Sequence, residues 1–349
     1  MKRTKYYFPE NKRKNINRFC EIKSIASYIP EKSLNNEDII NKYNLPIKSS
    51  FISKSLGVES RFIADDNQSD SDLLALAAER CLRKANFKVD DLSRIIVNKF
   101  YGDNLLPMTA SALQRKLESN TAIHAFDIEG GISSFLHAFD AASRFIATGD
   151  EYILIASGGI SNRMISKTDL RVGFLFGDAA AAVLLGRSEQ QHVLASYFYS
   201  NHNFYELSTA ITPLTLVDKR ETMTLEQQMA SVYDTYKTGN WKEAEEFYRE
   251  AVYAVSKNLF LESGLQIKDI DLVLVTENNR KIWELTLEVL GVGEEKSISL
   301  LRNHGNTMSA MLPLLLENGF STGKIQKGMN IMLISHGEGL SGGGILYKV

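Results

Sequence analysis

Matching segments recur along this chain at a separation of roughly 178 residues, and this repetition limits the folds that the sequence can adopt. Strands are expected at 95–97, 125–128 and 152–156 with helices at 113–117 and 134–148, then strands at 272–275, 297–301, 331–335 and 344–347 with helices at 282–290 and from 307. Such alternation is typical of an α/β fold. The period is too long for a solenoid and favours two duplicated α/β halves, with unrelated halves in coincidental order as the alternative.

The length of 349 residues also favours two packed units, because one hydrophobic core rarely organises so long a chain. We divide the chain into a basic N-terminal arm at 1–18, a first half at 19–186 and a second half at 187–349. The Met- and Tyr-rich residues 219–247 match nothing in the first half and are expected to form an insertion. For the arm, basic residues without apolar periodicity favour a solvated tail over a specific anion site.

Composition excludes several classes of function. With 40 Lys+Arg against 42 Asp+Glu, the chain carries no overall charge signal for nucleic acid. No apolar run reaches the roughly 18 residues that span a bilayer, and no secretory signal is present, so a cytoplasmic protein is expected. Cys20 and Cys81 are too few for a disulfide scaffold, and Cys81 lies on one apolar helix face, as an inert core residue would. The six histidines lack ligand spacing, so we expect no metal site.

Two strand-to-helix turns carry the candidate functional residues. Residues 130–135 read Gly-Gly-Ile-Ser-Ser-Phe and place small residues at a helix N-terminus, where backbone N–H groups favour an anion or a nucleophile. Ser133 is a candidate nucleophile there, although a helix-capping role is favoured. Residues 303–307 read Asn-His-Gly-Asn-Thr and occupy the corresponding turn of the second half. In a duplicated fold the two turns meet near a pseudo-two-fold axis, which predicts a shared pocket.

Residues 337–342 match the pattern G-x-G-x-x-G, but only seven residues follow them. No helix can open there, so the dinucleotide-binding interpretation fails. A glycine-rich hairpin that lets backbone approach the pocket is expected instead. The expected pocket is therefore lined by Gly131, Gly305, His336 and Gly339.

Four segments follow one another in the order that a known family shows: 126–128 before the small-residue turn, 175–180, 304–310 and 337–341. Together they resemble the signatures of the β-ketoacyl-acyl-carrier-protein synthase III family of the thiolase superfamily, and the resemblance runs from about residue 19 to residue 349. It implies a layered αβαβα thiolase fold that is usually a dimer. It also implies action on acyl groups carried by coenzyme A or acyl carrier protein, with no permanently bound cofactor.

The resemblance implies three catalytic side chains. A cysteine at the start of a buried helix is acylated, and a histidine and an asparagine hydrogen-bond the thioester oxygen. Placed on this chain, the cysteine position falls on Ile132 and the histidine position on Thr276, so that only Asn306 matches. Since isoleucine cannot hold an acyl group and threonine does not titrate near neutrality, the ordinary condensing reaction is not expected of this chain alone.

Three functions stay open at this point. The leading hypothesis is a non-condensing subunit that pairs with an active synthase in fatty-acid, polyketide or other secondary-metabolite assembly, with a homodimer as the alternative state. The second is an acyltransferase or thioester hydrolase with Ser133 as nucleophile, or with His304 or His336 as base. The third is an acyl-thioester-binding protein without chemistry.

Three glutamates, Glu129, Glu277 and Glu338, lie close in sequence to the expected pocket. If they converge, their mutual repulsion raises their pKa values and disfavours an anionic thioester. The alternative is that each carboxylate faces solvent at a strand end.

Overall fold

The computed structural model describes residues 6–10, 17–170, 172–201, 208–210, 236–238, 241–337 and 341–349. Its strands are β1 (Cys20–Tyr28), β2 (Lys32–Asn35), β3 (Ser60–Ile63), β4 (Arg94–Lys99), β5 (His124–Glu129), β6 (Tyr152–Gly159), β7 (Ala179–Arg187), β8 (Val193–Ser200), β9 (Ser208–Ala210), β10 (Tyr236–Thr238), β11 (Leu272–Val275), β12 (Asn330–His336) and β13 (Ser341–Lys348). Its α-helices are α1 (Asn36–Tyr43), α2 (Ser49–Leu56), α3 (Asp70–Ala85), α4 (Thr109–Lys116), α5 (Ser134–Ala147), α8 (Trp241–Ser263), α9 (Arg280–Leu290), α10 (Leu301–His304) and α11 (Met311–Ser321).

The central strands are almost continuously buried and have apolar residues at their centres, as is typical of strands covered on both faces. The first sheet has the order β1-β7-β6-β4-β5, and the second has the order β11-β12-β13-β8. In each sheet a parallel pair (β4 with β6, β11 with β12) continues into antiparallel neighbours (β7 and β1, β13 and β8). The two sheets therefore repeat one topology, as the duplicated sequence pattern predicts.

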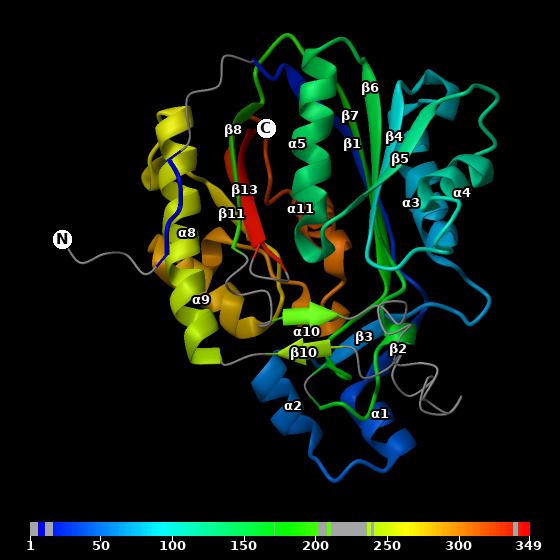
Figure 1. Ribbon diagram of the computed structural model, residues 1–349, viewed down its shortest axis with the longest axis vertical. Coiled ribbons are helices and arrows are strands. Elements are labelled where there is room, and N and C mark those ends of the chain that lie inside the picture. Colours follow the sequence, from blue (N-terminus) through cyan, green and yellow to red (C-terminus); the bar gives the residue numbers. More distant parts are fainter. Residues whose placement is uncertain are drawn as a thin grey trace, which may run out of the picture.

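Two helices lie between the sheets and form the centre of the molecule (Figure 1). Helix α11 is buried from Met311 to Leu316, and α5 buries Phe135, Phe139 and Ile146. The first part of α11 is apolar on all sides and belongs in such an interior, because no face of it can meet water. Helix α3 covers the outer face of the first sheet, and α8 and α9 cover the second (Figure 1). The layers are thus αβαβα, the expected thiolase-like fold.

The prediction of a strand at 297–301 is wrong. Within this segment only Ser297 makes a parallel bridge, to Val273, and the chain then turns into the short helix α10. The cause is a buried carboxylate: Glu277 accepts hydrogen bonds from the backbone N–H groups of Leu300 and Leu301, at 2.7 and 3.0 Å. These N–H groups begin a helix because a side chain, and not a neighbouring strand, satisfies them.

The expectation of a fully solvated N-terminal arm is also wrong, at Tyr6 and at Arg18. Tyr6 is 5% exposed and packs against the ring of Phe247 of α8. Arg18 is 2% exposed and binds Asp140 of α5 at 2.7 Å. Both residues tie the start of the chain to helices that follow far along the sequence.

Parts of the expected insertion at 219–247, and both Glu338 and Gly339, lie outside the described residues. Within the described ranges, no helix combines the length and the apolar character needed to cross a membrane.

Candidate functional site

The turn that enters α5 places a hydrocarbon side chain at the start of the central helix. Gly131 has φ 56°, in the left-handed region that glycine tolerates, and a short 3-10 turn over Gly131–Ser133 leads into α5. Ile132 is 3% exposed. Its buried apolar cluster consists of Val58, Ile132, Ile165, Val172, Leu175, Phe176, Leu301 and Met308. The side chain at this helix entrance therefore packs within an apolar cluster.

The second turn holds Asn306 in a fixed position. Its backbone N–H donates to the Leu175 carbonyl at 2.8 Å, and its carbonyl accepts from Gly177 at 3.0 Å. Its side-chain Oδ1 accepts from the Met308 N–H at 2.8 Å, while Nδ2 donates to the Asn278 carbonyl at 3.4 Å. Since Nδ2 carries two hydrogens and this one bond is long, Asn306 keeps the capacity to donate to a ligand oxygen.

The two turns pack against each other, as the duplication predicts. Met308 follows Asn306 and adopts φ 54°, which is unusual for a residue other than glycine and stores backbone strain. Its side chain joins the cluster around Ile132. Thr307 and Met308 also line a small cavity of about 10 Å³, room for a single water molecule. None of the residues that line this cavity belongs to the turn that carries Ile132, so it is not the shared pocket that the sequence predicts.

The glycine at position 177 is required by backbone crowding. A Cβ on Gly177 would lie 1.9 Å from the His304 carbonyl oxygen. Only glycine allows the loop at 175–177 to run so close to the turn that carries Asn306.

Thr276 lies at the end of β11 and is 1% exposed. Its hydroxyl donates to Ser335 Oγ at 3.2 Å and accepts from the backbone N–H of His336 at 3.1 Å. Because the single hydroxyl proton is already used within the protein, Thr276 has no donor left for a ligand in this arrangement.

His336 is fully buried, and both ring nitrogens face hydroxyl groups. Nδ1 lies 3.0 Å from the Tyr199 oxygen and Nε2 lies 3.3 Å from Thr286 Oγ1. Burial lowers the pKa of His336 to about 4, so the ring is neutral at pH 7. A ring held in this way acts as an internal hydrogen-bonding residue.

The remaining candidates for base and nucleophile do not meet. His304 is half-buried, its Nδ1 lies 3.1 Å from the Leu300 carbonyl oxygen, and burial lowers its pKa. Ser133 is 1% exposed and donates to the Gly130 carbonyl at 3.1 Å. Among the described residues no histidine lies within hydrogen-bonding distance of the Ser133 hydroxyl, so this geometry lacks the nucleophile–base pair that activates a serine.

Of the three glutamates near the expected pocket, the two that the structure describes, Glu129 and Glu277, have different surroundings and different partners. Glu277 is fully buried and accepts from Leu300, Leu301 and Ser299, whereas Glu129 has a 70% exposed side chain that pairs with Lys99 at 2.7 Å. Burial raises the pKa of Glu277 to about 7. Burial, and not repulsion between the glutamates, therefore raises the pKa of Glu277. The alternative that each carboxylate faces solvent is right for Glu129 and wrong for Glu277.

Sequence reasoning missed Asn278, which links the ends of two strands. Its Nδ2 donates to the His336 carbonyl at 2.7 Å, and its own carbonyl accepts from Asn306. The only signal was its place directly after an apolar strand, where side chains gather at a sheet edge.

Family models match both halves of the chain. Residues 126–202 match the model for 3-oxoacyl-[acyl-carrier-protein (ACP)] synthase III, and residues 260–349 match the model for its C-terminal part. A protein of Neisseria gonorrhoeae named β-ketoacyl-[acyl-carrier-protein] synthase III is 27% identical over 331 residues, which is 95% of this chain and 99% of that protein. A protein of the same name from Campylobacter jejuni is 28% identical over 337 residues, covering 94% of this chain and 97% of its own.

Solved structures agree with the sequence matches. The crystal structure of 3-oxoacyl-[acyl-carrier-protein] synthase III from Aquifex aeolicus superposes with a TM-score of 0.84 at 25% identity, covering 95% of this chain and all of that one. This chain is therefore similar to the synthase III proteins in both halves, and it shares their fold. A priming β-ketosynthase from the R1128 polyketide pathway shares the fold, with a TM-score of 0.84 at 21% identity.

For the synthase III-like chain, the assignment of Ile132 and Thr276 to the family's cysteine and histidine positions stays a prediction, as do the roles of Asn306, Ser133 and His304.

Across the part of the chain that the structure describes, no group of three or more His, Cys, Asp or Glu side chains is placed to hold a metal ion. Cys20 and Cys81 are buried, and burial raises their pKa values to about 12 and about 11, which keeps both thiols unreactive.

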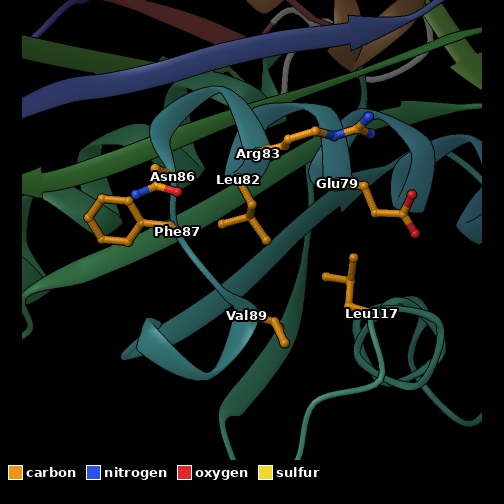
Figure 2. Close-up of a pocket in the computed structure, with 7 residues that line it drawn as sticks. All are labelled: Glu79, Leu82, Arg83, Asn86, Phe87, Val89 and Leu117. Atoms are coloured by element: carbon orange, nitrogen blue, oxygen red, sulfur yellow. The ribbon is translucent and has the colours of Figure 1, made fainter.

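A surface pocket of about 340 Å³ lies away from these turns of the synthase III-like chain. Figure 2 shows it between the C-terminal end of α3 and Leu117 after α4, with Leu82, Val89 and Leu117 around its apolar part. Glu79, Arg83 and Asn86 supply its polar edge. The pocket shares no residue with the turns that carry Ile132 and Asn306.

Proposed function

We propose that this chain is a non-condensing subunit, which pairs with an active relative of the same family in the assembly of acyl thioesters for fatty-acid, polyketide or other secondary-metabolite biosynthesis. The observation that carries the proposal is the buried Ile132 at the entrance of α5. An intact family fold with hydrocarbon at the expected acylation position supports a structural role beside a partner that does the chemistry.

The first sheet offers a surface that suits a partner. Strand β5 is at the edge of the sheet in the described part of the chain, and its residues are only partly buried. The loop before α4 exposes Leu105 and Leu106, at 80% and 78%. The end of this loop is tied to β5, because Asp127 accepts from the Thr109 N–H at 2.9 Å. An open strand edge beside exposed apolar side chains favours pairing with a second subunit.

Asn306 supports a residual role for the site in thioester binding. Its side chain is fixed by the Met308 N–H and retains a donor, as the family position requires. A thioester of coenzyme A or acyl carrier protein is the ligand that this donor fits, and we expect it to bind in exchange and not as a resident cofactor.

Affinity purification of the tagged chain from its native host tests the partner role. The expected result is a stoichiometric complex with a second synthase III-like protein that carries the cysteine and histidine which this chain lacks. The purified complex should form 3-oxoacyl product, and this chain alone should not.

The variant Leu106→Asp tests the proposed contact surface, because it places a charge on the exposed loop without changing the turns that carry Ile132 and Asn306. This variant should lose the partner and keep its thermal unfolding temperature. Recovery of the unmodified chain only as a self-dimer, or partner recovery unchanged by Leu106→Asp together with condensing activity of this chain alone, would count against the proposal.

A further inference from the structure

The small cavity of about 10 Å³ beside the turn that carries Asn306 is built from segments that lie far apart in the sequence. Asp70 begins α3, residues 158–161 end β6 and start the loop after it, and Thr307 and Met308 lie before α11. A cavity of this volume admits one water molecule and is too small for an organic ligand.

The Asp70 carboxylate forms part of the cavity wall. Its Oδ1 accepts from the Ile160 N–H at 3.0 Å, and a Cβ on Gly159 would lie 1.9 Å from the same oxygen. Gly159 has φ 136°, and only glycine lets the backbone run so close to the carboxylate. Since Asp70, Gly159 and Ile160 all line the cavity, the carboxylate lies at its edge.

This carboxylate is buried without a full set of hydrogen-bond donors. Asp70 is 8% exposed, and within the described ranges no donor reaches its Oδ2. Burial raises the pKa of Asp70 to about 6, and the negative charges of Asp103 and Asp178 add to this shift. At pH 7.5 the group is still mostly ionised, and a buried carboxylate oxygen that lacks a donor is costly.

The Thr307 hydroxyl, on another wall of the cavity, also lacks a partner. Thr307 is 2% exposed, and its Oγ1 has no hydrogen-bond partner among the described residues. Ser161, a third lining residue, donates its hydroxyl proton to the Gly177 carbonyl at 3.2 Å and keeps lone pairs that accept. The cavity is thus lined by a charged acceptor, a hydroxyl donor and a second acceptor, and a buried water needs two to four such partners.

We propose that this cavity is a binding site for one structural water molecule, which bridges the Asp70 carboxylate and the Thr307 hydroxyl. The water donates a hydrogen bond to Asp70 Oδ2 and accepts one from Thr307 Oγ1, and its second hydrogen is available to the Ser161 oxygen. This bridge ties the start of α3 to the turn in which Asn306 and the strained Met308 lie. The inference does not depend on the partner role, because it needs only the folded chain and water.

A crystal structure of the full chain, at a resolution that shows ordered water, tests the site directly. We expect one water oxygen at about 2.5–3.0 Å from both Asp70 Oδ2 and Thr307 Oγ1. Thr307→Ser keeps the hydroxyl and should keep this water, whereas Thr307→Val keeps the branched shape without a hydroxyl and should lose it. A parent cavity that is empty or filled by a side chain or a metal ion, or a water that stays unchanged in Thr307→Val, would overturn the proposal.

Thermal unfolding of parent and Thr307→Val gives a second readout, because the sign of the change separates the two cases. If a water satisfies the Thr307 hydroxyl, the substitution removes a hydrogen bond, and the midpoint temperature should fall by about 2 °C or more. If the hydroxyl has no partner, the substitution removes a buried unsatisfied polar group, and the midpoint should stay the same or rise. The second result would also overturn the proposal, and the crystal structure of the parent decides the matter if the variant does not fold.

Discussion

The Arg18 guanidinium donates a 2.7 Å hydrogen bond to the Asp140 carboxylate in the central helix α5, 122 residues further along the chain. Arg18 also donates to Ser196 of β8 at 2.9 Å and to Glu262 of α8 at 3.2 Å. One side chain thus joins the central helix, the second sheet and the outer helix layer. Since Arg18 is only 2% exposed, its charge depends on these partners.

Replacing Arg18 should therefore be costly. Arg18→Ala leaves the carboxylates of Asp140 and Glu262 without their buried cation, and we expect it to lower the free energy of unfolding by about 3 kcal/mol. Urea unfolding measures the change. Arg302→Ala is the matched control, because Arg302 pairs with Glu59 on an exposed surface and should matter little. Equal, small effects of the two substitutions would show that the Arg18 network does not stabilise the fold.

Glu277 predicts an unusual dependence of stability on pH. Burial raises its pKa from 4.5 to about 7, so the folded protein holds this proton more tightly than the unfolded chain does. Stability should fall as pH rises through this window, by at most about 3.5 kcal/mol at about 1.4 kcal/mol for each pKa unit. Glu277→Gln keeps an oxygen acceptor for the N–H groups of Leu300 and Leu301 and carries no charge.

The measurement compares urea unfolding of parent and Glu277→Gln at pH 5 and pH 8. The variant should be the more stable of the two at pH 8, by about 1 to 3 kcal/mol, and the difference should shrink at pH 5. A difference that is the same at both pH values would contradict a titration of Glu277 in this range.

Local patterns predicted most of the central layers. The apolar periodicity of α5, and the β-branched runs that became β4, β11 and β12, each carry their own burial signal within a few residues. Matching order in the two halves then predicted that the turns before α5 and α11 meet, which they do. These features need no knowledge of distant partners.

Other features depend on distant residues and could not be predicted in this way. In sequence, Arg18 looks like the other basic residues of the segment 1–18, and its burial is made tolerable by Asp140, Ser196 and Glu262. Residues 297–301 have the composition of a strand, but Glu277 captures their N–H groups and starts a helix.

His336 predicts a loss of stability in acid. Burial lowers its pKa to about 4, so between about pH 6.5 and pH 4 the unfolded chain takes up a proton that the folded protein excludes. Stability should fall as pH drops through this range. His336→Gln still reaches the hydroxyls of Tyr199 and Thr286 and does not titrate.

Comparing the parent and His336→Gln at pH 7.5 and pH 4.5 isolates this effect, because every other titrating group is common to both. The parent should lose about 2 to 3 kcal/mol more than the variant on acidification. His124→Gln, at an exposed position, serves as the control and should follow the parent. A parent that loses no more than His336→Gln would mean that the buried ring accepts its proton without unfolding.

Ile132→Cys tests directly whether the missing thiol separates this chain from an acylating enzyme. A cysteine at the start of α5 lies where the helix dipole favours a thiolate. Incubation with acetyl-coenzyme A should therefore add one acetyl group to the variant, on the peptide that spans position 132, and none to the same peptide of the parent. Ile132→Ala removes the same bulk without supplying sulfur and should stay unmodified there.

Condensation with a malonyl thioester should remain weak until Thr276→His is added, which we expect to raise the rate by on the order of 10²-fold, since it supplies a donor to the thioester oxygen. Product formation in radiolabelled assays measures each step. An Ile132→Cys chain that folds but takes up no acyl group would mean that the position is not the family's acylation site, and the partner-subunit role would lose its main support.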